Sequence, residues 1–210
     1  MTKYLTEFVG TLFLVLTIGL TVLGQSPMAP LAIGASLMIM VYMGGHISGG
    51  HYNPAVSLAA MLRGKLATGE LGPYIVAQLL GAIVASLLVY LILGRTFAPA
   101  PAPTASVIAA LLVEVLYTFA LCIVVLNSAC HEKTKGNSFY GLAIGFTIVV
   151  AVFAGSGVSG GAFNPAVGIG PTLVNVLMGG GSFGSLWLYV VGPLLGGVLA
   201  SGLFKIQEQG

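Results

Sequence analysis

The stretch Ser48-Gly49-Gly50-His51-Tyr52-Asn53-Pro54-Ala55-Val56 interrupts an apolar part of the chain, and it returns as Ser159-Gly160-Gly161-Ala162-Phe163-Asn164-Pro165-Ala166-Val167. Asn164 follows Asn53 by 111 positions, and the same shift aligns residues 31–56 with residues 142–167 without a gap. The outer segments match more loosely, with Leu79 facing Leu194. The chain therefore contains an internal repeat, with copies at approximately 1–97 and 106–207.

The composition indicates an integral membrane protein. Of 210 residues, 57% are apolar and 6% are charged, and the mean hydropathy is +1.05. A soluble domain of this size could not bury so much apolar surface. The 31 glycines favour close helix packing in a bilayer. The net charge of +2 argues against a nucleic-acid partner, and Cys122 and Cys130 are predicted to be free thiols.

Six apolar runs are long enough to cross a bilayer, which takes about 20 helical residues. Two weaker apolar runs, 54–62 and 165–177, are about half as long. Each half of the chain then has three spans, an odd number, so the halves enter the membrane from opposite sides. The predicted fold is an all-α membrane protein with two re-entrant half-helices in an inverted repeat and six transmembrane helices, at 4–24, 31–49, 72–93, 106–127, 139–158 and 185–204.

The basic residues predict the orientation. Arg95 alone falls on one side of this topology, and the other six fall on the opposite side: Lys3, Arg63, Lys65, Lys133, Lys135 and Lys205. Because basic loops stay in the cytoplasm, we expect a multi-pass protein of the cell membrane with both termini cytoplasmic. Glu7 in the first apolar run, with a counterpart at Glu114, indicates a span rather than a removable signal peptide. Residues 99–103, rich in Ala and Pro, are expected to form a semi-rigid outer loop.

The repeated motif has a physical interpretation. Each motif begins with irregular backbone, at Gly49 and Gly50 and again at Gly160 and Gly161. Such backbone is tolerated at membrane depth only where protein encloses it or a cavity hydrates it. Asn53 and Asn164 are expected to cap two short helices that begin at Pro54 and Pro165. The helices would meet N-terminus to N-terminus, so their dipoles disfavour cations while the two Asn amides donate to passing oxygens. The alternative is that Asn-Pro merely caps two re-entrant helices of a transporter.

On these residues the chain resembles the aquaporin, or major intrinsic protein, family. The resemblance rests on both Asn-Pro-Ala motifs, the run 44–56, the paired glutamates and Gly192-Pro193. It implies a single channel domain over 1–210 and a homotetramer with six tilted spans around a pore in each subunit. It also implies passive flow of small neutral solutes across the lipid bilayer, with no cofactor, no metal and no enzymatic activity.

The resemblance also assigns roles to individual residues. Glu7 and Glu114 are expected to brace the half-helix loops, although a proton relay is the default reading of an intramembrane carboxylate. His46 is placed near the cytoplasmic half of the pore, where its side chain lines the pore or tunes its properties. The remaining assignments are the two pore motifs (Asn53, Pro54, Ala55 and Asn164, Pro165, Ala166) and the pore-lining backbone at Gly49, Gly50, His51, Gly160 and Ala162.

The outer filter departs from the family pattern. Most members carry an Arg after the second Asn-Pro-Ala, and this chain has Val167. The other three filter positions fall on Ile33, Val152 and Gly161, so the ring is apolar and uncharged. Such a ring predicts a wide filter that passes glycerol, urea, ammonia or neutral metalloid acids as well as water. The subfamily markers are mixed, with Gly168 and Tyr189-Val190 matching neither glycerol nor water channels.

Other functions remain as alternatives to this prediction. A water-selective aquaporin is the first. An ion-coupled secondary transporter also uses inverted repeats and broken helices, but it needs an ionisable group at the midplane, where this chain has Asn, Gly and Pro. An intramembrane enzyme would need a nucleophile with a base or a metal cluster, and the sequence has no such grouping.

Overall fold

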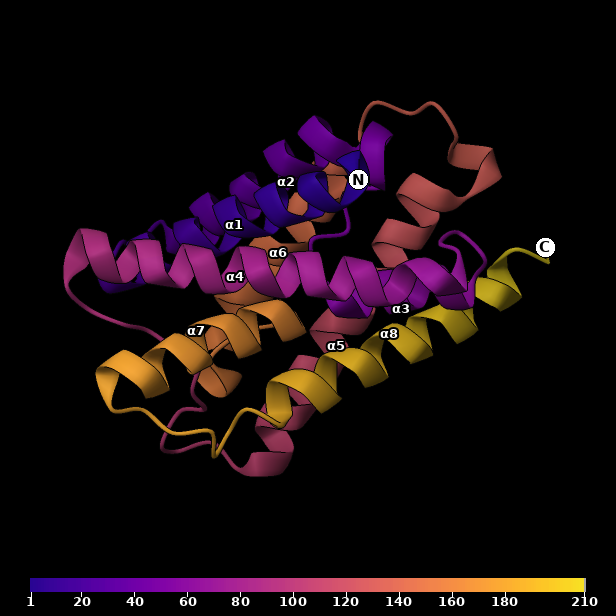
Figure 1. The fold of residues 1–210 in the computed structure, drawn as a ribbon. Helices are drawn as coiled ribbons and strands as arrows, with labels where there is room; N and C mark the ends of the chain where they lie inside the picture. The colour runs from indigo at the N-terminus through magenta and orange to yellow at the C-terminus, as the bar shows by residue number, and fades with distance from the viewer. Residues whose placement is uncertain (210) are drawn as a thin grey trace.

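The computed structural model describes residues 1–209 and is built from helices (Figure 1). Six of its helices are long and apolar enough to cross a membrane, which confirms the predicted spans. They are α1 (Thr2–Leu23), α2 (Ala29–Ser48), α4 (Leu71–Leu93), α5 (Val107–Val125), α6 (Tyr140–Ser159) and α8 (Leu188–Gln207). The two short helices are α3 (Pro54–Leu62) and α7 (Pro165–Gly179). The connecting turns are η1 (Thr68–Glu70), η2 (Leu126–Cys130) and η3 (Glu132–Thr134).

The predicted helix limits are close to the observed ones except at the last span. Both half-helices begin at the proline of their motif, as expected from its fixed φ and missing N–H. The last span was expected over 185–204, but α8 covers Leu188–Gln207. The residues before it form hydrogen-bonded turns, with the amide of Leu188 donating to the carbonyl of Ser185. An apolar turn of this kind cannot be told from a helix by hydropathy alone.

The two halves pack around a close contact between α2 and α6. A Cβ atom added to Gly34 would lie 2.5 Å from the carbonyl oxygen of Gly145, and one added to Gly145 would lie 2.6 Å from that of Gly34. These two glycines are related by the repeat, so the contact lies where the halves meet, and the absence of a side chain lets the backbones approach. Within the halves, α1 packs on α4 and α5 packs on α8.

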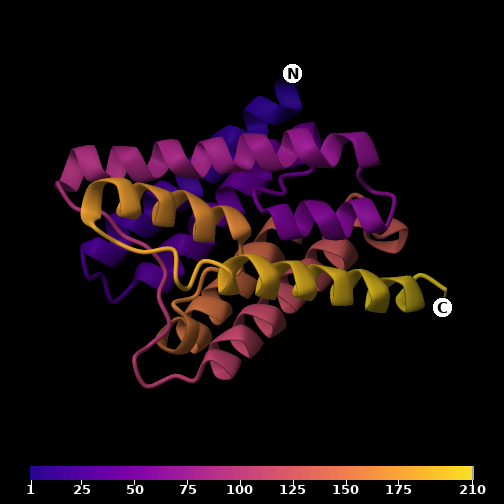
Figure 2. The same cartoon turned by 60° about the horizontal axis from the view of Figure 1, so that its bottom comes forward.

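The half-helices fill the space between the long ones. Figures 1 and 2 show α3 and α7 end to end between α4 and α8. Both touch α4 and α8, and α3 also touches α7. Apolar side chains such as Leu91 and Ile108 are exposed on the outer helix faces. The fold therefore presents an apolar outside, as a bilayer requires, and encloses its irregular loops.

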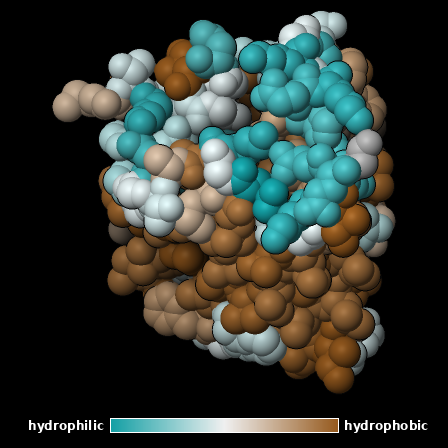
Figure 3. Space-filling model, turned by 90° about the vertical axis from the view of Figure 1, so that its right-hand side faces the viewer, coloured by the Kyte–Doolittle hydropathy of each residue, from teal (hydrophilic) through white to brown (hydrophobic). Residues whose placement is uncertain are grey.

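Both termini lie at one end of the bundle. Lys3 pairs with Glu70 at 2.7 Å, in the segment between α3 and α4. Arg63 of the same segment pairs with Glu208 at 2.7 Å, next to the C-terminus. Arg95 lies at the opposite end, where its guanidinium donates to the carbonyl of Leu23. Figure 3, which faces the side of the molecule where the C-terminus lies, shows hydrophilic residues gathered in one region and hydrophobic residues over the rest.

Candidate pore and its two crossing loops

The two repeated motifs follow the same backbone path. After α2, Gly49 and Gly50 have φ of 91° and 63°, and Tyr52 has φ of 49°. After α6, Gly160 and Gly161 have φ of 90° and 69°, and Phe163 has φ of 51°. Glycine reaches this left-handed region without a steric cost, whereas a bulky aromatic residue does so only where its surroundings hold it. The aromatic position is therefore strained in both loops.

The two asparagines join the half-helices. Each caps its own helix, because Asn53 Oδ1 accepts from the amide of Ala55 at 2.9 Å and Asn164 Oδ1 accepts from that of Ala166 at 2.9 Å. Each also crosses to the other half. Asn53 Nδ2 donates to the carbonyl of Phe163 at 2.9 Å.

The reciprocal bond runs from Asn164 Nδ2 to the carbonyl of Tyr52, also at 2.9 Å. An amide NH₂ carries two protons, so each asparagine keeps one N–H for another partner. Asn53 and Asn164 both line the central cavity. The two helix N-termini and two free amide donors therefore meet at one level of that cavity.

Glu7 holds the first loop from behind. Its Oε1 accepts from Ser48 Oγ at 2.7 Å and from the amide of His51 at 3.0 Å. Its Oε2 accepts from the amide of Tyr52 at 2.7 Å and from Gln78 Nε2 at 2.8 Å. The side chain is fully buried, and all four donors lie in or against the loop. A carboxylate satisfied in this way fixes the strained backbone.

Glu114 holds the second loop with one donor fewer. Its Oε1 accepts from Ser159 Oγ at 2.7 Å and from the amide of Ala162 at 3.0 Å, and its Oε2 accepts from the amide of Phe163 at 2.7 Å. The position that matches Gln78 in the alignment of α4 with α8 is Pro193, which has no side-chain donor. The serine and backbone donors are thus repeated, and the donor from the neighbouring long helix is not.

A chain of polar side chains continues from Glu7 in the first half alone. Gln78 Nε2 also donates to Ser57 Oγ at 2.9 Å, and Ser57 Oγ lies 3.0 Å from His51 Nδ1. Because Ser57 accepts from Gln78, its single proton is free to bond His51 Nδ1. Ser57 Oγ can also accept from Nδ1–H through its second lone pair, so this contact fits either tautomer of the imidazole. The second half has Gly168 and Ala162 at the matching positions.

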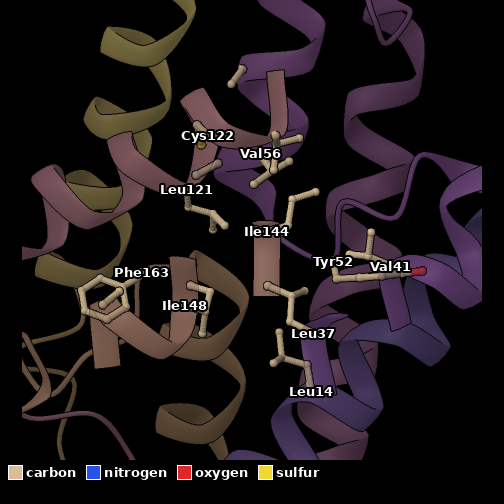
Figure 4. Close-up of a cluster of buried hydrophobic side chains, with 14 of the residues drawn as sticks. Leu14, Leu37, Val41, Tyr52, Val56, Leu121, Cys122, Ile144, Ile148 and Phe163 are labelled. Carbon is tan, nitrogen blue, oxygen red and sulfur yellow. The ribbon is translucent and has the colours of Figure 1, made fainter. Parts of the chain in front are cut away.

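A cavity of about 410 Å³ runs between the long helices and the two loops. One wall is formed by α1, α2, α5 and α6, whose side chains there are apolar except for Ser156, and Figure 4 shows Leu14, Leu37, Leu121, Ile144 and Ile148 gathered there. Tyr52 and Phe163 lie on opposite sides of this group. The loops form the other wall.

The loop wall offers free backbone acceptors. Within residues 1–209, the carbonyl oxygens of Gly50, His51, Gly161 and Ala162 accept no hydrogen bond from protein groups. A buried backbone carbonyl needs a partner, and water or a solute in the cavity can supply one. The cavity therefore has one apolar side and one side that accepts hydrogen bonds.

Most residues predicted for the pore lie on the cavity wall. The four filter positions, Ile33, Val152, Gly161 and Val167, all line it. So do the predicted loop positions Gly50, His51, Asn53, Gly160, Ala162 and Asn164.

Six other predicted positions lie away from the wall. Pro54, Ala55, Pro165 and Ala166 are buried behind it. Gly49 and His46 are not among the residues that line this cavity, and their places along the pore stay predictions. His46 is exposed in the last turn of α2, and the chain turns inward only at Gly49. His51, after the turn, is the histidine on the cavity wall.

Several residues of the site were not predicted from the sequence. Ser57 and Gln78 extend the Glu7 network, Ser156 lines the cavity on α6, and Ala98 and Ala100 contribute to its outer wall. The available signal was the presence of polar side chains in otherwise apolar helices. Among the described residues, no group of three His, Cys, Asp or Glu side chains could hold a metal ion.

The comparisons with known proteins agree with this geometry. The family model described as "Major intrinsic protein" matches residues 1–204. This chain belongs to the major intrinsic protein family. Among curated members it is 37% identical to "Aquaporin NIP1-1" of Zea mays, over 97% of this chain and 74% of that protein. It is 36% identical to "Aquaporin Z" of Rhodopseudomonas palustris, over 97% and 92%.

A third relative is "Glycerol uptake facilitator protein-like 6" of Lactiplantibacillus plantarum, which is 35% identical over 96% of this chain and 95% of its own length. In fold, this major intrinsic protein matches the X-ray structure of the aquaglyceroporin from Plasmodium falciparum with a TM-score of 0.87 and 23% identity, covering 97% and 94% of the two chains. As a member of the family, it is a multi-pass membrane channel for small solutes such as water and glycerol, and it is not an enzyme.

Proposed function

We propose that this channel conducts neutral solutes larger than water, such as glycerol, urea, ammonia or neutral metalloid acids, in addition to water. The observation that carries the proposal is Val167, in place of the Arg that most members have there. Val167 lines the cavity together with Ile33, Val152 and Gly161. Among the described lining residues none is Arg, Lys, Asp or Glu. Such an apolar ring lowers the free-energy barrier to the passage of carbon-bearing solutes, and it leaves a wider opening than a ring that contains an arginine.

Exclusion of cations is assigned to the level of the two asparagines. The N-termini of α3 and α7 meet there, and their partial positive charges repel a cation. The free N–H groups of Asn53 and Asn164 donate to solute oxygens and offer a cation no ligand. With the arginine missing from the filter, this level carries the whole electrostatic barrier. The proposal includes a homotetramer in the cell membrane with both termini cytoplasmic, as the basic residues indicate.

The test is a panel of stopped-flow measurements on the purified protein in liposomes, with water, glycerol, urea, ammonia and arsenite. Val167→Arg should lower glycerol and urea permeability by about tenfold or more, while water permeability stays within about threefold. Val167→Leu is the matched control, because it adds bulk without charge and should have an intermediate effect. Protein-free liposomes give the background.

Three results would contradict the proposal. If the wild-type protein conducts water and none of the larger solutes, it is a water-selective aquaporin. If glycerol and urea permeabilities are the same before and after Val167→Arg, the filter is not at this ring. If flux saturates and depends on a proton or sodium gradient, the protein is an ion-coupled transporter rather than a passive channel.

A further inference from the structure

We propose that Ser156 is a further specificity-determining residue of this channel, and that its hydroxyl is the hydrogen-bonding side-chain group of the outer filter. The inference rests on the proposed conduction of larger neutral solutes. It assigns a polar role to a position outside the four-residue ring, in a filter whose side chains are otherwise apolar.

The first observation is the position of Ser156 on α6. The cavity-facing residues of this helix are Ile144, Ile148, Val152 and Ser156, at a spacing of four. This spacing puts them on one face of the helix. The lining residues of α1, α2 and α5 are all apolar. Among the described residues, Ser156 is therefore the one hydroxyl that the long helices present to the cavity.

The second observation is that this hydroxyl is free. Ser156 is exposed, and within residues 1–209 its Oγ has no hydrogen-bond partner. The other serine and threonine hydroxyls of α6 are occupied. Thr147 Oγ1 donates to the carbonyl of Ala143 at 2.8 Å, and Ser159 Oγ donates to Glu114 at 2.7 Å. A serine in a helix usually bonds back to the preceding turn or points to solvent, and here the solvent is the content of the cavity.

The third observation places Ser156 at the level of the filter. A Cβ atom added to Gly161 would lie 3.0 Å from the Cβ of Ser156, so the two residues are in contact. Gly161 belongs to the filter ring and contributes only backbone. Val152, another ring residue, lies one helical turn before Ser156. Ser156 is thus at the edge of the ring, in contact with Gly161.

The loop between α4 and α5 fixes this edge of the pore. Ala98, Pro99 and Ala100 line the cavity, and the amide of Ala102 donates to the carbonyl of Val158 at 3.0 Å. A Cβ atom on Gly160 would lie 2.6 Å from the backbone nitrogen of Ala100, so the loop packs directly on the end of α6. The wall around Ser156 is therefore held by backbone contacts and does not depend on a ring side chain.

The chemistry of a hydroxyl suits solutes of the proposed class. A solute that enters an apolar ring gives up hydrogen bonds to water, and each unreplaced bond raises the barrier. Serine both donates and accepts, so it can bond the hydroxyl of glycerol or the amide and carbonyl of urea. An arginine only donates, and it carries a charge. Ser156 would therefore lower the barrier for polar neutral solutes without narrowing the pore.

The experiment compares Ser156→Ala, Ser156→Thr and Thr147→Val in liposomes containing matched amounts of folded protein. Ser156→Ala should lower the ratio of glycerol or urea permeability to water permeability about fivefold, and should raise the activation energy for these solutes. Ser156→Thr keeps the hydroxyl and should retain at least about half of the ratio. Thr147→Val removes a hydroxyl from the same helix away from the cavity and should change neither quantity.

The outcomes separate this inference from the proposed function. A glycerol-to-water ratio in Ser156→Ala that equals or exceeds the wild-type ratio overturns the role of Ser156 while conduction of glycerol stands. An equal loss in Ser156→Ala and Ser156→Thr also overturns it. If the wild-type protein conducts only water, the proposed function fails, and the readout becomes the water permeability. An unchanged water permeability in Ser156→Ala then overturns the inference as well.

Discussion

The loops that precede α3 and α7 have nearly equal φ angles at matching residues. The side chains that hydrogen-bond to the two loops differ in part. In the first loop, Glu7 accepts four hydrogen bonds, and a polar chain leads on through Gln78 and Ser57 to His51. In the second, Glu114 accepts three, and Gly168 and Pro193 occupy the matching places. The comparison shows that both loops share the carboxylate, its serine donor and its two backbone donors, which is the support that the loop path requires. The rest of the support is free to differ between the halves.

The largest expected difference between the halves comes from replacing the two carboxylates. A glutamine at position 7 can turn its NH₂ toward the amide of His51 and Ser48 Oγ, and the serine hydroxyl can reverse and accept. At position 114 the amide can turn its NH₂ toward the amide of Phe163 alone. Each change leaves one backbone amide without an acceptor, but Glu7→Gln removes the charge from the acceptor of four hydrogen bonds and Glu114→Gln from that of three. Because bonds to charged groups are each worth about 1.5–3 kcal/mol, both variants should lose at least about that much stability, with the larger loss for Glu7→Gln.

Thermal unfolding of the two variants in detergent, followed by circular dichroism, checks this order. The wild-type protein and Glu132→Gln, a change at a loop residue on the surface, serve as references. An equal loss in the two variants, or a larger one for Glu114→Gln, would show that the fourth donor from Gln78 carries no weight.

The next prediction compares the stability lost when Ser57 and its repeat counterpart Gly168 are replaced. Gly168 is packed against α8, where an added Cβ atom would lie 2.5 Å from the Cβ of Tyr189. Gly168→Ser should therefore cost about 1–3 kcal/mol through overpacking. Ser57→Ala in the other half should cost a similar amount for a different reason, since it leaves His51 Nδ1 and one of the two N–H groups of Gln78 without a partner. Gly168→Ala separates the two causes, because it should be as costly as Gly168→Ser in the same unfolding measurement.

A smaller effect is expected from the aromatic pair at the strained positions. The hydroxyl of Tyr52 donates to the carbonyl of Met40 at 2.8 Å, and Phe163 has no such bond. Tyr52→Phe should cost about 1 kcal/mol. Tyr74 and Tyr189 bond the carbonyls that end α2 and α6, at 2.7 and 2.5 Å. Tyr74→Phe and Tyr189→Phe should lower the free energy of unfolding by equal amounts. Unequal losses would show that these two hydrogen bonds are not equivalent in the two halves.

The smallest expected difference in stability is between the C-terminal ends of the half-helices α3 and α7. The segment after α3 is held by Arg63 and Lys65, which pair with Glu208 at 2.7 and 3.3 Å. The end of α7 is held by a neutral pair, Thr96 and Asn175, at 2.7 Å. The hydrogen bond from Arg63 lowers the pKa of Glu208 below the usual carboxyl value.

The contribution of Glu208 to stability is therefore fully present above the usual carboxyl pKa and is lost as the pH falls through the lowered one. Partly exposed pairs are screened by salt, so the effect is small and present only at the α3 end. Hydrogen-exchange protection factors, which correct for the slower intrinsic exchange in acid, should fall at residues 60–66 in acid, in high salt and in Glu208→Gln. The protection factors of residues 174–179 should not change, and a change there would contradict the contrast between the two ends.

The repeat explains why so much of the fold could be predicted. The paired Asn-Pro motifs mark the start of both half-helices, because a capping asparagine and a proline at the first helical position specify a helix N-terminus locally. The start of α8 was misplaced, since the turn before it is as apolar as a helix. The chain from Gln78 through Ser57 to His51 was missed for another reason. It joins α3 to α4, and no short-range pattern connects residues that meet only after the helices pack.

The same limit applied to the cavity wall. Aligning the repeat with the family pattern identified the four ring positions, all of which line the cavity. It said nothing of Ser156, whose counterpart in the first half is Gly45 and which has no place in that pattern. Its placement of His46 near the cytoplasmic half of the pore stays a prediction, since His46 lies in the last turn of α2 and outside the lining of this cavity.

The crossed bonds between Asn53 and Phe163, and between Asn164 and Tyr52, have a consequence for biosynthesis. A ribosome completes the first loop 111 residues before the partner that satisfies it exists. Until then the carbonyl of Tyr52 and the amide of Asn53 lack their protein partners, and leaving them so in hydrocarbon is costly. The first half-helix must therefore stay hydrated, or outside the bilayer core, while the second half is made. Insertion of α7 is then the event that lets both halves settle together.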